Sequence, residues 1–179
     1  MTKLKTCYRC KLHGTRTNIV WGSGPINSPI KIVGEGPGRE EDESGIPFVG
    51  RSGRLLRFVL SELGGDQIFN HIFITNIVMC RPPNNRNPEP EEIAACNYWL
   101  QYKLMTCRPK AIGCIGKVSA DHLLGVGKWR WNGVYRKNKI LFIPIYHPAY
   151  ILRNGEKMGD FKNGISRLLR KGELWKGEL

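Results

Sequence analysis

Residues 30–53 of this chain read IKIVGEGPGREEDESGIPFVGRSG, and their pattern indicates the fold class. It begins with a short apolar run, Ile30 to Val33, which predicts a buried strand. Glycines at 34, 36 and 38 then let the backbone turn sharply and approach a ligand closely. A helical segment, 51–63, closes the unit. In open α/β folds such a loop lies at the carboxyl edge of the sheet, so we predict the ligand site here.

Three further apolar runs alternate with helical segments along the rest of the chain. The predicted strands are 30–33, 72–78, 111–116 and 140–146, with Pro144 indicating an edge position or a strand end. The predicted helices are 51–63, 89–106, 118–124 and 160–175. This alternation predicts an α/β protein, a three-layer α/β/α sandwich with a central four-stranded parallel sheet. No repeat or linker divides the chain, so we expect a single domain over 1–179.

Composition narrows the classes of function. The chain has 28 Lys and Arg against 15 Asp and Glu, a net charge of +13, which favours a polyanionic partner such as nucleic acid over a merely solvated basic surface. No apolar run could span a bilayer or serve as a signal-peptide core, so we expect a soluble, cytoplasmic protein. We further expect it to associate with nucleic acid and to work as a monomer. The glycines of 34–38 do not fit the dinucleotide fingerprint, which argues against a nicotinamide or flavin enzyme.

Cysteine spacing indicates a metal site. Cys7 and Cys10 are separated by two residues, so both thiolates can reach one metal. Cys80 comes at the end of the second predicted strand, and Cys96 lies in the helix that follows, so the fold could bring these two together. Four thiolates suit zinc or an iron–sulfur cluster, and the wide second spacing favours the cluster without excluding zinc. The remaining two cysteines, Cys107 and Cys114, are predicted to be buried structural residues.

Several sequence blocks together carry a resemblance to a known family. They are GEGPG at 34–38 with Glu41 and Asp42, GIPFVGRSG at 45–53, ITN at 74–76, CRPP at 80–83, NRNP at 85–88 and HPAYILR at 147–153. With these blocks in this order, the chain resembles the family 4 uracil-DNA glycosylases, the iron–sulfur-containing branch of that superfamily. The resemblance implies a monofunctional DNA-repair hydrolase. Such an enzyme flips uracil out of single- or double-stranded DNA and cleaves its N-glycosidic bond, releasing free uracil and leaving an abasic site.

The resemblance also implies a cofactor and a base pocket. Cys7, Cys10, Cys80 and Cys96 match the family's ligands for a 4Fe-4S cluster, which would fasten the N-terminal segment to the loop and helix after the second strand. Phe48 would offer a flat face to the flipped base, and the backbone of Gly36 would bind its edge. Asn76 would donate to uracil O4 and accept from N3–H, a pattern that cytosine does not match.

The catalytic assignments follow from the charges that develop as the bond breaks. His147 would hydrogen-bond the departing base at O2, where negative charge appears. A carboxylate would activate water and stabilise the cationic sugar, and we expect Glu41 before Glu35 in this role. The resemblance further places Glu41 against the C5 edge of the base, where it would exclude thymine. Glu40, Asp42 and Glu43 are predicted to form a solvated run.

Basic residues beside the motif loops complete the prediction. We expect contacts with DNA phosphates from Arg51, Arg54, Arg81, Arg86 and Arg153. Residues 150–153 would enter the duplex and fill the vacated space. Two alternatives remain open: a glycosylase-like module that binds DNA or a replication partner without turnover, and a zinc-stabilised nucleic-acid-binding protein.

Overall fold

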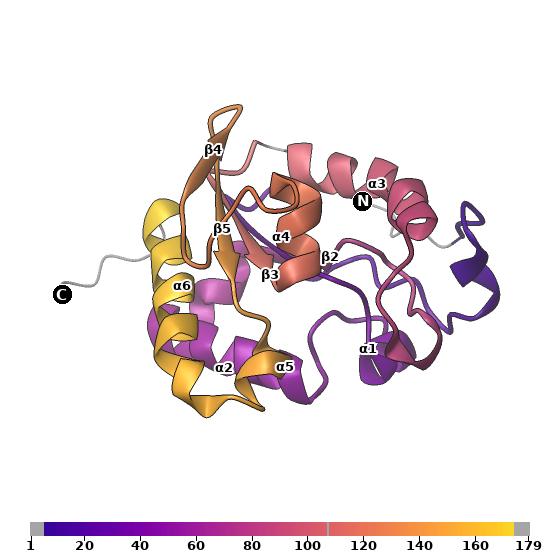
Figure 1. The fold of residues 1–179 in the computed structure, drawn as a ribbon, viewed down its shortest axis with the longest axis horizontal. Coiled ribbons are helices and arrows are strands. Elements are labelled where there is room, and N and C mark those ends of the chain that lie inside the picture. The colour runs from indigo at the N-terminus through magenta and orange to yellow at the C-terminus, as the bar shows by residue number, and fades with distance from the viewer. Residues whose placement is uncertain (1–5, 107, 174–179) are drawn as a thin grey trace.

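The computed structural model describes residues 6–106 and 108–173, and within them one sheet lies between two layers of helices (Figure 1). Its strands are β1 (Ile30–Gly34), β2 (Ile72–Asn76), β3 (Ala111–Ile115), β4 (Tyr135–Lys137) and β5 (Ile140–Ile145). The spatial order is β2-β1-β3-β5-β4, and the first four strands in this order are parallel. The predicted α/β/α sandwich around four parallel strands is therefore confirmed.

The fifth strand, β4, was not predicted. It pairs antiparallel with β5, matching Arg136 to Leu141 and Lys137 to Ile140. Two of its three residues are exposed and basic, so it lacks the alternation that marks a strand, although such residues suit a sheet edge. The expectation for Pro144 is confirmed because it is the next-to-last residue of β5, beyond the part that β4 covers.

The helices are α1 (Arg39–Ser44), α2 (Arg51–Gly64), α3 (Pro90–Met105), α4 (Lys117–Leu124), α5 (Pro148–Ile151) and α6 (Met158–Lys171). Short 3₁₀ turns lie at Lys11–Gly14, Asp66–Asn70, Pro83–Asn85 and Gly155–Lys157. The four predicted helices are confirmed with small shifts at their ends. The last begins two residues earlier than predicted and ends at Lys171, short of the predicted end at 175, which lies outside the described residues, as does Cys107. The helices α1 and α5 were missed because each is too short to show a period.

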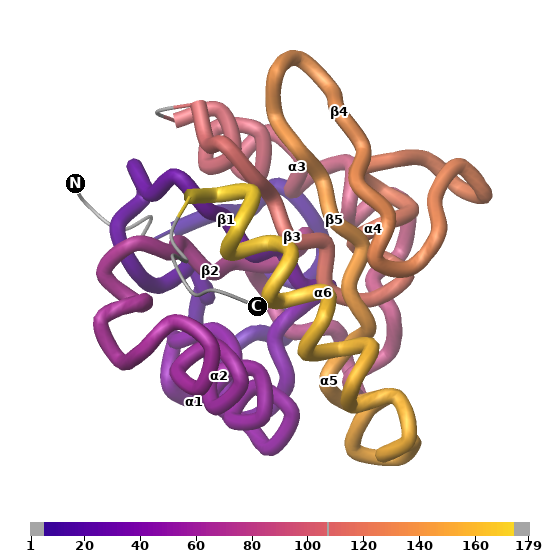
Figure 2. The backbone as a smooth tube through the Cα atoms, turned by 90° about the vertical axis from the view of Figure 1, so that its left-hand side faces the viewer, coloured from indigo at the N-terminus to yellow at the C-terminus, as the bar shows by residue number. Residues whose placement is uncertain are grey.

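The two faces of the sheet bury separate cores. Figures 1 and 2 show α2 and α6 on one side and α3 and α4 on the other. Within β1, Ile30 and Ile32 belong to the core beneath α2 and α6, while Val33 belongs to the core beneath α3 and α4. This alternation is the two-residue period of a strand. Each fully buried aliphatic side chain contributes about 1.5–3 kcal/mol, so both layers are firmly attached.

Two buried lysines fasten the loop-rich N-terminal segment to the α3 side of the sheet. Lys31 and Lys103 are both completely buried. The Nζ of Lys103 donates to Thr75 Oγ1 (2.7 Å) and to the Trp21 carbonyl (3.2 Å), and it lies 5.1 Å from the centre of the Trp21 ring. Burial lowers the pKa of Lys103 to about 8. Lys31 donates to the Ile26 carbonyl (2.7 Å), so residues 21–26 are held from two points.

The parallel strands bring three predicted loops to one edge of the sheet. The glycine-rich loop follows β1, the segment that begins at Ile77 follows β2, and the segment that begins at Tyr146 follows β5. Carboxyl ends of parallel strands share one edge, so the side chains after all three strands can face a common space. Among the helices of the described residues, none is long and apolar enough to cross a membrane.

Candidate active site

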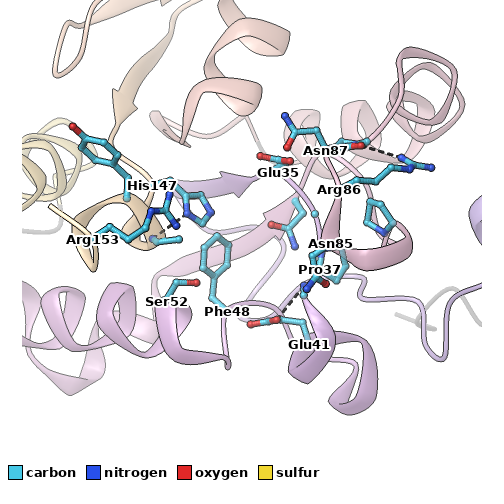
Figure 3. A pocket seen from close by; sticks show the side chains of 17 residues that line it. Glu35, Pro37, Glu41, Phe48, Ser52, Asn85, Arg86, Asn87, His147 and Arg153 are labelled. Carbon is cyan, nitrogen blue, oxygen red and sulfur yellow. Dashed lines mark hydrogen bonds between the residues drawn. The ribbon is translucent and has the colours of Figure 1, made fainter.

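A cavity of about 720 Å³ opens at this edge of the sheet. All six residues predicted for catalysis and base binding line it: Glu35, Gly36, Glu41, Phe48, Asn76 and His147. Figure 3 shows Phe48 and His147 on one side of the space and Glu35 and Arg86 across from them. The fold therefore brings together the predicted groups from the ends of three strands, from α1 and from the segment between α1 and α2.

Phe48 forms a wall of the cavity in a constrained backbone conformation. Its φ angle is 56°, in the left-handed region that non-glycine residues rarely occupy. Arg57 stabilises this conformation by donating to the carbonyls of Phe48 (2.8 Å) and Pro47 (3.0 Å). A Cβ on Gly53 would lie 2.2 Å from the Phe48 carbonyl carbon, so glycine is required there. The residue is 6 % exposed and also packs against the α2 core, so Phe48 is at once a core and a cavity residue.

Asn76 presents an unsatisfied acceptor in the cavity. The residue ends β2 and is 2 % exposed, and within the described residues its Oδ1 is buried without a hydrogen-bond partner. Leaving such a group unpaired costs about 1–3 kcal/mol. Gly34 makes room for it, since a Cβ there would lie 2.4 Å from Asn76 Oδ1 and 2.5 Å from Phe48 Cζ. The orphan oxygen is suited to accept an N–H from a ligand.

His147 is held as a neutral donor. It is the N-cap of α5, where its Nδ1 accepts a hydrogen bond from the backbone N–H of Ala149 (3.1 Å). An accepting Nδ1 places the ring proton on Nε2. Burial lowers the pKa of His147 to about 4, with a further lowering by Arg153 and a smaller opposing effect of Glu41. At neutral pH the ring therefore offers an N–H to the cavity without carrying charge.

The two candidate carboxylates differ in their hydrogen bonding. Glu41 Oε1 accepts from the backbone N–H groups of Val49 (2.9 Å) and Gly50 (2.7 Å), and its Oε2 accepts from Gly38 (3.1 Å). This carboxylate fastens the glycine-rich loop to the start of α2. The carboxylate of Glu35 accepts no hydrogen bond from the described residues, and burial raises its pKa. Of the two, Glu35 has the carboxylate free to engage a ligand or water.

The predicted solvated run is wrong for Asp42. This residue is 2 % exposed, and its carboxylate accepts from the backbone N–H groups of Thr17 (3.0 Å) and Asn18 (3.2 Å). Glu40 and Glu43 are exposed as expected. Asp42 therefore joins α1 to the N-terminal segment, a structural role that one-dimensional charge patterning does not reveal.

The five arginines predicted to contact DNA are differently engaged. Arg86 forms a bidentate pair with buried Glu92 (2.9 and 2.7 Å), Arg81 donates to Asn85 Oδ1 (2.7 Å), and Arg54 pairs with Glu40 (3.0 Å). The side chains of Arg51 and Arg153 are exposed and make no hydrogen bond or ion pair with the described residues. Arg153 also lines the cavity. These two are therefore the arginines available to a phosphate.

Some cavity residues received no role from sequence. Ser52, Asn85 and Asn87 line the space. All three lie inside the sequence blocks that carry the family resemblance, and that location was the available signal. Residue type alone did not distinguish them from solvated loop positions.

The four predicted metal ligands come from two regions that the fold brings together. Cys80 and Cys96 are buried, and the pKa of Cys96, raised first by burial, is raised further by the nearby thiols of Cys10 and Cys7. In 6–106 and 108–173, however, no three Cys, His, Asp or Glu side chains converge closely enough to hold a metal ion. Four cysteine thiolates are a donor set found both at zinc sites and at iron–sulfur clusters. The donor set therefore fits an iron–sulfur cluster.

Comparisons of this chain with known proteins point to one superfamily. The family model described as "Uracil DNA glycosylase superfamily" matches residues 21–170. A Type-4 uracil-DNA glycosylase of Thermotoga maritima is 41% identical over 157 residues, covering 85% of this chain and 81% of the relative. One of Archaeoglobus fulgidus is 35% identical over 183 residues, covering 96% and 89%. One of Pyrobaculum aerophilum is 38% identical over 183 residues, covering 94% and 91%.

Proposed function

This chain belongs to the uracil DNA glycosylase superfamily, and we propose how its cavity removes uracil from DNA. The protein is a DNA-repair hydrolase that acts on the N-glycosyl bond of uracil. The observation that carries the proposal is the unpaired Oδ1 of Asn76 beside the Phe48 ring, in the same cavity as His147. A flipped uracil supplies the N–H that this oxygen lacks.

Base selection rests on Asn76 and Phe48. The amide of Asn76 accepts from uracil N3–H through Oδ1 and donates to O4 through its nitrogen. Cytosine has an unprotonated N3 and an amino group at C4, so both contacts would be lost, at about 1–3 kcal/mol each. Phe48 stacks on the base, and the backbone of Gly36 lines its edge. The fixed Glu41 carboxylate is our candidate for the wall that excludes the thymine methyl group.

Bond cleavage rests on His147 and Glu35. As the bond breaks, negative charge collects on uracil O2, and the Nε2–H of neutral His147 donates to it. Water adds to the sugar C1′, and we assign its activation to Glu35 because the oxygens of Glu41 already accept three backbone N–H groups. Within the described residues no lysine lines the cavity, so hydrolysis is favoured over a Schiff-base lyase step.

We further propose that Cys7, Cys10, Cys80 and Cys96 hold a 4Fe-4S cluster. When bound, it would link residues 7–10 to the segment after β2 and to α3, with a mainly structural role. Hydrogen bonds already join these regions, since Arg9 donates to the Ala95 carbonyl (3.2 Å) and Arg16 donates to Cys80 Sγ (3.4 Å). Cys96→Ala should lose iron and the brown absorbance near roughly 400 nm that thiolate-bound clusters give. Cys114→Ala, a control at a fully buried cysteine in β3, should keep both.

The remaining assignments concern contacts with DNA phosphates, the oligomeric state and the location of the protein. Arg51 and Arg153 are the first candidates for phosphate contacts, on single- or double-stranded DNA. We propose that the enzyme acts as a monomer, because one chain supplies every group discussed above, and that it works inside the cell, where its DNA lies.

The test is single-turnover incubation with oligonucleotides that carry one uracil, followed by alkali to break abasic sites. Uracil-dependent breaks are expected, with a loss of at least about 100-fold in Asn76→Ala and His147→Ala. Absence of breaks from correctly folded, iron-loaded protein would exclude turnover and leave a non-catalytic DNA-binding module.

A further inference from the structure

Three aromatic rings form a stacked column beside the cavity. The rings of Trp131 and Tyr146 are 4.3 Å apart at an interplanar angle of 25°, and those of Tyr146 and Tyr150 are 5.5 Å apart at 16°. Trp129 closes the far end, with its ring 4.7 Å from Trp131 at an angle of 72°. Nearly parallel planes at these separations make a continuous stack. The column joins the loop between α4 and β4 to the segment that follows β5.

The base of the column is rigidly held. Trp129 Nε1 donates to Asp121 Oδ1 (2.9 Å). Next to Trp131, the backbone N–H of Asn132 donates to the Pro144 carbonyl (2.9 Å), and its side-chain Nδ2 donates to the Asp160 carbonyl (2.9 Å). The column is therefore anchored to α4, to β5 and to α6. A fixed stack loses little conformational freedom when a further ring is added to it.

The other end of the column is open and lies at the cavity. Tyr150 is 36% exposed and lines the cavity, and among the described residues the aromatic ring that it stacks on is that of Tyr146. Its neighbour Arg153 also lines the cavity, with an unpaired cationic side chain. A partly exposed flat ring, next to a cation at the mouth of a base pocket, matches how proteins bind single strands, by base stacking and phosphate contact.

We propose that Tyr150 is the end of a stacking platform that binds the base adjacent to the flipped uridine in single-stranded DNA. The neighbouring base continues the column of Trp131, Tyr146 and Tyr150 while uracil occupies the pocket. In duplex DNA that base is already stacked and paired, so its gain from Tyr150 is smaller. The inference rests on the proposed function and adds to it a preferred substrate, an unpaired strand with a base beside the uracil.

The experiment measures coupling between Tyr150 and the neighbouring base. Oligonucleotides carry the 2′-fluoroarabino analogue of deoxyuridine, whose fluorine destabilises the cationic sugar and keeps the glycosidic bond intact. In single strands, the base on the 5′ side or on the 3′ side is replaced in turn by an abasic tetrahydrofuran. Fluorescence anisotropy gives Kd for the wild type, Tyr150→Ala, Tyr150→Phe and a control, Tyr98→Ala, at an exposed tyrosine of α3 outside the cavity.

For the wild type, Tyr150→Phe and Tyr98→Ala, removal of one neighbour should weaken binding about tenfold or more, the effect of losing one base–aromatic stack. Tyr150→Ala should bind the intact strand more weakly and respond little to the missing base. Equal sensitivity of Tyr150→Ala and the wild type would overturn the platform, and coupling seen only in duplexes would overturn the single-strand preference. If the wild type binds the analogue no better than thymidine, the proposed function itself fails, a separate result.

Discussion

The backbone N–H of Ala149 donates to Nδ1 of His147 over 3.1 Å, and this short-range contact fixes which ring nitrogen carries the proton. The same hydrogen bond caps α5, so the orientation of the ring and the start of the helix depend on one another. A protonated ring would need its Nδ1 to donate, in conflict with the Ala149 N–H. Geometry and burial therefore both favour the neutral imidazole.

The first prediction concerns pH and stability. The pKa of His147 is about 4 in the folded protein, against a usual value of 6.5 when exposed in the unfolded chain. Between these values the unfolded chain binds more protons, so His147 destabilises the fold as pH falls from 6.5 towards 4. Between pH 7.5 and 5 the loss should be on the order of 1–2 kcal/mol, measured by urea unfolding. His147→Gln should lack this part of the pH dependence, and an unchanged dependence in that variant would contradict the prediction.

The second prediction concerns Gly34, beside both base-binding side chains. Gly34→Ala places a Cβ within 2.4 Å of Asn76 Oδ1 and 2.5 Å of Phe48 Cζ, so both groups must move. A displacement of about 1 Å in an active site can cost roughly 100-fold in rate, and we expect at least that loss in single-turnover excision. Gly14→Ala is the matched control because a Cβ there meets nothing within 4 Å. Comparable activity of the two variants would show that the Gly34 contacts do not position the pocket.

Much of this cavity could be predicted from sequence because its residues follow the strands of a parallel sheet. Glu35 and Gly36 follow β1, Asn76 ends β2 and His147 follows β5 closely, so recognising three buried apolar runs was enough to bring these positions together. Phe48 could be placed because Pro47 and Gly50 flank it and mark a loop before α2.

What sequence did not reveal depends on contacts between distant residues. The burial of Asp42 depends on backbone groups of Thr17 and Asn18, far away along the chain. The aromatic column is likewise invisible in one dimension, since Trp131 belongs to a loop without periodicity and meets Tyr146 only after β5 is in place. The strand β4 has too few residues, and too polar ones, to produce a recognisable pattern.

The third prediction separates two arginines that sequence treated alike. Arg86 is committed to Glu92, which is 1 % exposed, whereas the Arg153 side chain has no partner in the described part of the chain. Arg86→Ala should lower the urea midpoint because it leaves a buried carboxylate unpaired. Arg153→Ala should keep the midpoint and weaken DNA binding, reducing the slope of log K against log salt by about 1. The assignment fails if the two variants exchange these effects.

The last prediction separates the two carboxylates. Glu41→Gln replaces a carboxylate that accepts three backbone N–H groups by an amide with one acceptor oxygen, and it should destabilise the protein by about 1–3 kcal/mol. Glu35→Gln should not destabilise it at pH 7. Burial raises the folded-state pKa of Glu35, so ionisation favours the unfolded chain as pH rises above the ordinary carboxyl range, and a neutral amide avoids that cost.

The pH–rate profiles of Glu35→Gln and Glu41→Gln should differ as well. If Glu35 activates the water, the single-turnover rate of the wild type rises with pH through the raised pKa of this carboxyl group. Glu35→Gln should be much slower, and its rate should no longer rise with pH in this range, so the acid limb of the profile is lost. Glu41→Gln changes the position of the loop, so it should be slower but keep the acid limb. Loss of the limb in Glu41→Gln alone would instead make Glu41 the base, acting through Oε2, which accepts only the Gly38 N–H and keeps one lone pair.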